Sequence, residues 1–256
     1  METTSRPTHT QRRTVATGAT ILGTAAFAAI VTSHTLVANT LTAVFGTARN
    51  PVFPTPLLDL TLQHGALVLV SSALTIAIGL PMGIWATRES GRDFRGVISA
   101  GIDFGQVFPP IAVLAVMFSA CGLGPAPAIL ALFLYGLFPV VSSTIAGLEA
   151  VPHEVVDAAR GMGMGRWRVL FFVELPLAAG VILAGVRTSV IVNIGTATVA
   201  AATGAGGLGL PVFTGISTDN IGYLAEGAIT VSAFALLVDG AIAVLSLWLR
   251  PECRFG

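Results

Sequence analysis

Long apolar stretches alternate with short polar segments along most of the chain. A helix that crosses a membrane needs about 20 predominantly apolar residues, and five or six stretches approach that length. They lie at about residues 15–38, 64–87, 97–119, 126–147, 177–202 and 224–248. The pattern predicts an all-α polytopic membrane protein with about six transmembrane helices.

Prolines interrupt the apolar pattern at two places. Pro109 and Pro110 fall inside the third stretch and should kink or break it, because proline lacks a backbone N–H and clashes with the preceding turn. A Pro-rich polar linker, residues 39–56, follows the first stretch. We therefore expect three parts: an N-terminal tail, an extra transmembrane helix and a linker in 1–60, a transmembrane core in 61–250, and a short cytoplasmic tail in 251–256.

The first stretch also has features of a secretory signal peptide, with a basic start, an apolar run and small residues at its end. Its apolar run is longer than that of most signal peptides, and no strong A-x-A cleavage site follows it. We therefore interpret residues 15–38 as a retained membrane anchor, with the signal peptide as the alternative.

Composition narrows the chemistry of the chain. Hydrophobic residues make up 54% of it, charged residues only 10%, and the mean hydropathy is +0.85, above that of water-soluble domains. The net charge of zero gives no indication of nucleic-acid binding. All 13 basic residues are arginine, which excludes a P-loop lysine for ATP hydrolysis and a Schiff-base lysine. The cysteines and histidines show no metal-ligand spacing, so no metal or cofactor site is expected on this chain.

Arginine positions predict the orientation, since short cytoplasmic loops carry an excess of positive charge. All arginines except Arg49 and Arg187 fall on one side if both termini are cytoplasmic. This group comprises Arg6, Arg12, Arg13, Arg88, Arg92, Arg95, Arg160, Arg166, Arg168, Arg250 and Arg254. We therefore expect a multi-pass protein of the bacterial plasma membrane with its N- and C-termini inside.

A charged segment, residues 148–176, lies on the predicted cytoplasmic side. Pro152 and Glu154 suit the start of a helix, because proline fits the first turn and a carboxylate complements the helix dipole. Gly161 and Gly163 should end this helix after about two turns. A second short helix, "RWRVLFFVE", then leads to Pro176 at the entry of the fifth span. The sequence predicts a projecting two-helix hairpin.

The hairpin resembles the cytoplasmic-loop signature of permease subunits of binding-protein-dependent ABC importers. That signature reads E-A-A, three residues, G, nine residues, I, one residue, L-P. Here Asp157-Ala158-Ala159, Gly163, Val173 and Leu175-Pro176 keep the spacing, with Asp in place of Glu and Val in place of Ile. The resemblance implies a type I importer permease fold whose hairpin docks on an ATPase subunit. The alternative is a hairpin that lies on the membrane surface.

The resemblance also implies partners and site residues. It implies two ABC ATPase subunits that bind ATP and Mg²⁺, an extracytoplasmic substrate-binding protein, and a second copy or a paralogue of the permease. This chain would then be no enzyme. The residues implied to contact the ATPase are Glu154, Asp157, Ala158, Ala159, Arg160, Gly161, Met162, Gly163 and Arg166.

Further phrases indicate a branch of this family. "VELPLA", "AGVRTS", "NIGTAT" and "GAGGLG" are similar to permeases that import glycine betaine, choline, carnitine and related quaternary amines. This likeness covers about residues 60–250 and excludes the first span. The methionine-importer permeases are the alternative, because they share the cytoplasmic-loop signature of residues 157–176 and the Gly-rich segment 204–209. Another alternative, an ATPase-independent secondary transporter, predicts inverted repeats, and no convincing repeat is present.

Arg187 is a charged residue inside the fifth span. A charge at this depth is costly and is usually paired or functional. Asp239 in the sixth span is the expected partner, with Glu226 as the alternative. The simplest interpretation is an ion pair that fixes helix packing, and the other is a role in gating or substrate passage.

Two further patterns have a functional and a structural interpretation. Ser189, Asn193 and Thr196 share one face of the fifth helix, so they could line the translocation path or mediate helix packing. "GAGGLG", 204–209, fits the dinucleotide fingerprint G-x-G-x-x-G, but that motif requires a preceding strand. Since a membrane helix precedes it here, we expect an irregular turn at the outer end of the fifth span.

Overall fold

A computed structural model describes residues 9–45 and 52–249. Within these ranges the chain is helical and has no strand, which confirms the all-α prediction. The main helices are α1 (His9–Thr32), α2 (His34–Phe45), α3 (Leu57–Ala86), α4 (Arg95–Val107), α5 (Pro110–Cys121), α6 (Pro125–Glu149), α7 (His153–Gly161), α8 (Arg166–Val169), α9 (Leu175–Ala200), α10 (Gly209–Ser217) and α11 (Ile221–Leu249). The described chain also contains three short helical segments: η1 (Arg92–Phe94), η2 (Leu170–Glu174) and η3 (Ala201–Thr203).

Four apolar helical stretches of the described chain are long enough to cross a membrane. They are Leu57–Ala86, Pro125–Glu149, Arg166–Thr203 and Ile221–Ser246, and they correspond to the second, fourth, fifth and sixth predicted spans. The other two predicted spans are broken helices. The third stops at Phe108 and restarts at Pro110, which confirms the predicted effect of the two prolines. The first was expected to be continuous over 15–38, and this is wrong: α1 ends at Thr32 and α2 begins at His34.

The centre of the bundle is formed by α3, α6 and α9. Its hydrophobic cluster contains residues of all three helices, Leu114 of α5 and Ala205 of the turn after η3: Leu67, Val68, Leu114, Ala128, Ala131, Leu132, Ile194, Ala197, Ala200 and Ala205. Many of these side chains are small, so the helix backbones approach closely, as is usual where helices pack in lipid. This packing holds α9, which carries most of the predicted path and ion-pair residues, against the other two helices.

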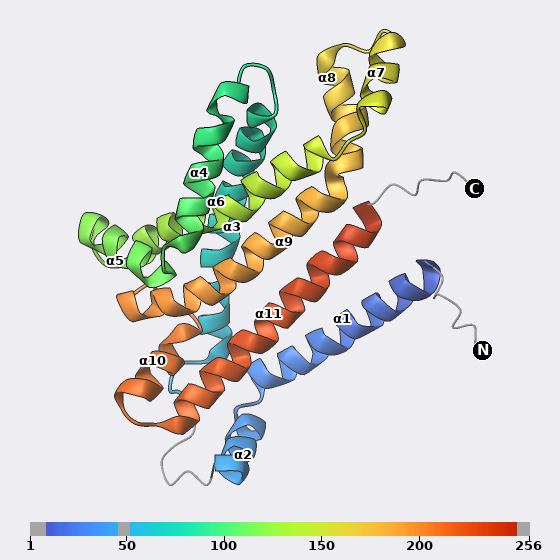
Figure 1. Cartoon of the computed structure of the whole chain (residues 1–256). Helices are drawn as coiled ribbons and strands as arrows, with labels where there is room; N and C mark the ends of the chain where they lie inside the picture. The colour runs from blue at the N-terminus through green and yellow to red at the C-terminus, as the bar shows by residue number, and fades with distance from the viewer. Residues whose placement is uncertain (1–8, 46–51, 250–256) are drawn as a thin grey trace, which may run out of the picture.

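Helix α11 lies between α9 and α1 (Figure 1). On the α1 side, the rings of Phe27 and Phe234 lie 5.9 Å apart. Near the N-terminal end of α11, Glu226 is buried, and its Oε2 accepts a hydrogen bond from the backbone N–H of Phe53 at 2.6 Å. The predicted extra helix is therefore packed along the last helix of the core.

The ends of the helices agree with the alternation of sides that the sequence predicted. Figure 1 shows the α7–α8 hairpin, the turn between α3 and α4, and the end of α11 at one end of the molecule, with α2 and α10 at the other. The arginine-bearing loops that the structure describes therefore lie together. The predicted N-terminal tail up to residue 8, residues 46–51 of the linker and the tail 251–256 lie outside the described residues.

Candidate functional site

The predicted two-helix hairpin is present, and α7 is its first arm. Val156 and Ala159 of this helix are buried against Val169 and Leu170 of the second arm. The residues on its other faces are exposed: Glu154, Asp157, Ala158, Arg160 and Gly161. Since α7 is anchored by one apolar face, its polar face is free to meet a partner. Ala159 alone among the implied contact residues points inward, and we assign it to packing.

The turn after α7 requires glycine at position 163. Gly163 has φ +84°, a left-handed conformation that strains other residues. The backbone N–H of Gly163 bonds to the carbonyl of Arg160 at 2.9 Å, and that of Met164 bonds to the carbonyl of Ala159 at 3.2 Å. These two bonds make a Schellman motif, which satisfies the last carbonyls of the helix. The sequence pattern therefore has a glycine at position 163 because the turn after α7 requires a left-handed backbone there.

Apolar side chains cover the tip and the second arm of the hairpin. Met162 is 77% exposed, and Trp167, Phe171 and Phe172 are also exposed. The ring of Trp167 stacks on that of Phe171, with 6.3 Å between their centroids, and the Arg166 guanidinium lies 5.4 Å from the Trp167 ring. Exposed aromatic residues next to arginine are typical of interface centres. Sequence reasoning missed Trp167, Phe171 and Phe172, although the run "RWRVLFF" contained them.

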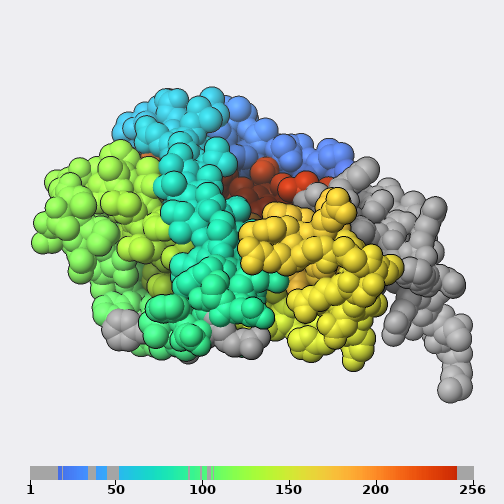
Figure 2. Space-filling view, turned by 90° about the horizontal axis from the view of Figure 1, so that it is seen from above, coloured from blue at the N-terminus to red at the C-terminus, as the bar shows by residue number. Residues whose placement is uncertain are grey.

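Two ion pairs join the base of the hairpin to neighbouring loops. Arg88, which follows α3, donates from Nη2 to Oε2 of Glu174 in η2 at 2.5 Å, and the Glu174 side chain is only 11% exposed. Arg95 at the start of α4 pairs with Glu149 at the end of α6. Seen from the hairpin end, the yellow hairpin lies beside the green segment around α4 (Figure 2). The two pairs therefore connect the hairpin segment to the C-terminal end of α3 and the start of α4.

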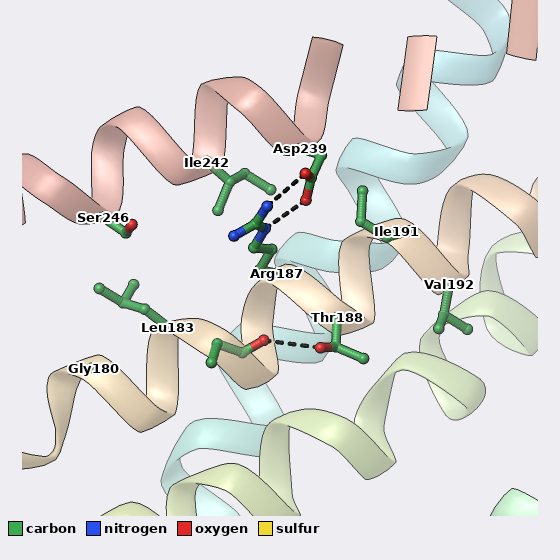
Figure 3. A pocket seen from close by; sticks show the side chains of 10 residues that line it. Gly180, Leu183, Arg187, Thr188, Ile191, Val192, Asp239, Ile242 and Ser246 are labelled. Atoms are coloured by element: carbon green, nitrogen blue, oxygen red, sulfur yellow. Dashed lines mark hydrogen bonds and ion pairs between the residues drawn. The ribbon is translucent and has the colours of Figure 1, made fainter. Parts of the chain in front are cut away.

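The structure brings Arg187 and Asp239 together. Nε of Arg187 donates to Oδ1 of Asp239, and Nη2 donates to Oδ2, both at 2.5 Å (Figure 3). The pair borders a cavity of about 440 Å³ between α9 and α11. The alternative partner, Glu226, instead accepts a hydrogen bond from the backbone N–H of Phe53, near the N-terminal end of α11.

The polar stripe on α9 is buried inside the protomer. Ser189 is 1% exposed, Asn193 0% and Thr196 5%. Ser189 donates to the carbonyl of Gly136 on α6 at 2.8 Å, while Thr196 bonds within its own helix. Asn193 donates to the hydroxyls of Ser71 and Ser72 on α3, both at 3.3 Å. These contacts support the packing interpretation and give the path interpretation no support in this conformation.

The Gly-rich segment 204–209 forms an irregular turn after α9 and η3, as expected. Gly206 and Gly207 have φ values of +81° and +84°. A Cβ on Gly206 would lie 2.6 Å from Oε1 of Gln63, and that same oxygen accepts a hydrogen bond from the N–H of Gly207. Because a helix and not a strand precedes the turn, the dinucleotide interpretation is excluded. Within the described residues no group of three or more His, Cys, Asp or Glu side chains could hold a metal ion.

This geometry is that of a helical membrane protein with a projecting hairpin whose exposed polar and aromatic side chains can contact another protein. Residues 79–251 match the family described as binding-protein-dependent transport system inner membrane component. An osmoprotectant import permease protein of Salmonella typhimurium, OsmY, is 38% identical over 77% of this chain and 83% of its own. A glycine betaine/carnitine/choline transport system permease protein of Bacillus subtilis, OpuCB, is 34% identical over 77% of this chain and 89% of its own.

Solved structures show the same fold. An inward-facing structure of the MetNI methionine ABC transporter contains a chain that aligns with a TM-score of 0.67 and 21% identity. The alignment covers 78% of this chain and all of that one. The chain therefore belongs to the family of binding-protein-dependent transport system inner membrane components, in its osmoprotectant permease branch. It is a multi-pass component of a transporter with the type I ABC importer permease fold.

Proposed function

We propose that this chain forms the translocation pathway of an ATP-driven importer for a compatible solute of the quaternary-amine class, such as glycine betaine, choline or carnitine. The observation that carries the proposal is the identity of 34–38% to permeases named for these solutes, over 77% of the chain. The likeness to the methionine transporter is at 21% identity and supports the fold alone. The named relatives therefore favour the quaternary-amine class over the methionine alternative.

The proposed working unit contains other chains. Two ABC ATPase subunits would bind ATP and Mg²⁺ and hydrolyse ATP, because this chain has no lysine for a P-loop. A substrate-binding protein would deliver the solute on the outer side, and a second copy or a paralogue of this permease would complete the pathway. The exposed face of α7 and the aromatic residues of α8 and η2 support the hairpin as the ATPase contact. Both termini would then lie in the cytoplasm.

The experiment that tests this function is uptake by the complete importer in proteoliposomes. The chain is purified with the ATPase and binding protein that co-purify with it, and ATP is enclosed in the lumen. We expect ATP-dependent uptake of radiolabelled glycine betaine, choline or carnitine and none of methionine. Uptake of methionine alone would contradict the proposed substrate class. Uptake without ATP or an ATPase would contradict the proposed importer and favour a secondary transporter.

A further inference from the structure

The cavity beside Arg187 lies about halfway through the membrane. Arg187 is twelve residues from the start of α9, which corresponds to about 18 Å at 1.5 Å per residue. Asp239 is ten residues before the end of α11, or about 15 Å. The hydrocarbon core of a bilayer is about 30 Å thick. Both charges are therefore near its middle, on the half that bears the hairpin.

The pair is open on one side although it is central in depth. The Arg187 side chain is 43% exposed and that of Asp239 32%. A charge exposed to lipid at this depth would be strongly unfavourable, and such residues face a bundle interior or water. The open side therefore faces water or another protein chain in the assembled importer, and not lipid.

Arg187 has hydrogen-bonding capacity that Asp239 does not use. A guanidinium presents five N–H donors in a rigid fork with two edges suited to carboxylates. Asp239 occupies the edge formed by Nε and Nη2. Figure 3 shows the third nitrogen, Nη1, pointing away from Asp239 towards the space between Leu183 and Ser246. A second carboxylate can therefore bind the Nη1 and Nη2 edge without displacing the first.

The walls of the cavity are otherwise mostly apolar. Leu183 and Ile191 of α9 and Ile242 of α11 line it, with Thr188 and Ser246 as the neutral polar side chains. Its volume of about 440 Å³ falls in the ~300–1,000 Å³ range of small-molecule pockets. Small residues, Gly180 and Ala184, form the remaining wall and leave space beside the fork.

The charge balance selects a chemical class of ligand. Arginine and aspartate sum to zero, so a bound anion or cation would leave an uncompensated charge at mid-membrane depth, which is costly. A small zwitterion adds none. Its carboxylate can take the free edge of Arg187, and because Nη2 lies between the two carboxylates, its cationic group then lies beside Oδ2 of Asp239. Methyl groups on that cation would contact the apolar walls.

We propose that the cavity between α9 and α11 is a binding site for a zwitterionic solute, with Arg187 holding the carboxylate and Asp239 the cationic group. This inference rests on the proposed function and deepens it, since glycine betaine and carnitine carry both charges whereas choline lacks the carboxylate. Arg187 then determines specificity inside the permease itself, after the binding protein has released the solute.

The test is direct binding of radiolabelled glycine betaine to the permease–ATPase complex in lipid nanodiscs, without the binding protein and with choline as competitor. Arg187→Lys keeps a positive charge opposite Asp239 but removes the fork. We expect it to weaken glycine betaine binding by about tenfold or more, the usual effect of losing a hydrogen bond to a charged group. Choline, a cation without a carboxylate, should compete only weakly with glycine betaine for the wild-type site. Ser246→Leu, which fills the space next to Nη1, should weaken glycine betaine binding as well.

Arg95→Lys is the matched control, because Arg95 also pairs with a carboxylate, that of Glu149, away from the cavity. It should leave glycine betaine binding unchanged. Equal binding of glycine betaine by assembled wild type, Arg187→Lys and Ser246→Leu would overturn the inference, as would absence of binding by a wild-type complex that imports glycine betaine. In both cases the proposed function would stand. If the complete importer took up no quaternary amine, the proposed function itself would fail.

Discussion

Arg88 and Glu174, 86 residues apart in sequence, form a 2.5 Å ion pair that ties the end of α3 to the segment joining the hairpin to α9. The Glu174 side chain is 11% exposed and that of Arg88 32%, so water screens the pair only in part. If the hairpin receives the movement of an ATPase subunit, this contact passes the movement to two membrane helices at once.

A double-mutant cycle measures this coupling. Arg88→Ala and Glu174→Ala should each lower the thermal stability of the purified complex, and the interaction free energy from the cycle should be about 0.5–3 kcal/mol. The exposed pair of Arg95 and Glu149 provides the matched cycle, with an expected interaction of about 0–1 kcal/mol. Equal interaction energies in both cycles would contradict a special role of the Arg88–Glu174 contact.

Gly163→Ala should weaken the attachment of the ATPase subunit. The substitution puts a Cβ on a residue with φ +84°, which costs about 1–2 kcal/mol and opens the turn between the two arms. The measurement is the amount of ATPase subunit that co-purifies at equal permease yield. Gly165→Ala is the control, because Gly165 has φ −67° and a Cβ there would meet no atom within 4 Å. Gly163→Asn, which tolerates the left-handed conformation, should fall between the two.

Cysteine labelling tests the orientation of the chain. In a background with Cys121→Ala and Cys253→Ala, Arg166→Cys in the hairpin should react with an impermeant maleimide only from the cytoplasmic side. Ser217→Cys at the end of α10 should react only from outside, since both positions are exposed and lie at opposite ends of the molecule (Figure 1). The reverse pattern would contradict the orientation that the arginine distribution predicts.

The Arg187–Asp239 pair should affect assembly in a non-additive way. Either single alanine variant leaves an unpaired charge at mid-membrane depth, a cost of about 2.5–3.5 kcal/mol on insertion scales. We expect less assembled complex on native gels for each single variant. The double variant should recover much of the assembly and still lack glycine betaine binding. Additive losses of assembly would show that the two side chains do not stabilise each other.

Asn193→Ala should reduce stability and leave selectivity unchanged. It removes the hydrogen bonds from α9 to Ser71 and Ser72 on α3, and interhelical hydrogen bonds in membranes contribute about 0.6 kcal/mol on average and up to about 1.7. The melting temperature of the complex should fall, while the ratio of glycine betaine to choline uptake stays constant. Thr198→Ala is the control, because the Thr198 hydroxyl bonds within its own helix. A changed uptake ratio would support the interpretation that Ser189, Asn193 and Thr196 line the translocation path.

Features that depend on local physics could be predicted from the order of the amino acids. Helices in lipid must satisfy their own backbone groups, so apolar length predicted the long spans, and the two prolines predicted the break between α4 and α5. Pro152 and Glu154 at the start of a helix and Gly161 and Gly163 at its end predicted the hairpin, and the φ of +84° at Gly163 explains the second glycine. Arg187 and Asp239 could be matched from sequence because so few charges lie inside the spans.

Which faces of the helices are covered depends on contacts between segments that are distant in sequence. The spacing of Ser189, Asn193 and Thr196 gave one face of a helix, but periodicity cannot say whether water or another helix meets that face; packing against α3 and α6 buried it. The break at Ser33, between α1 and α2, had no proline to signal it. The partners of Arg88 and of Glu226 lie 86 and 173 residues away in sequence, and only the fold brings them within hydrogen-bonding distance.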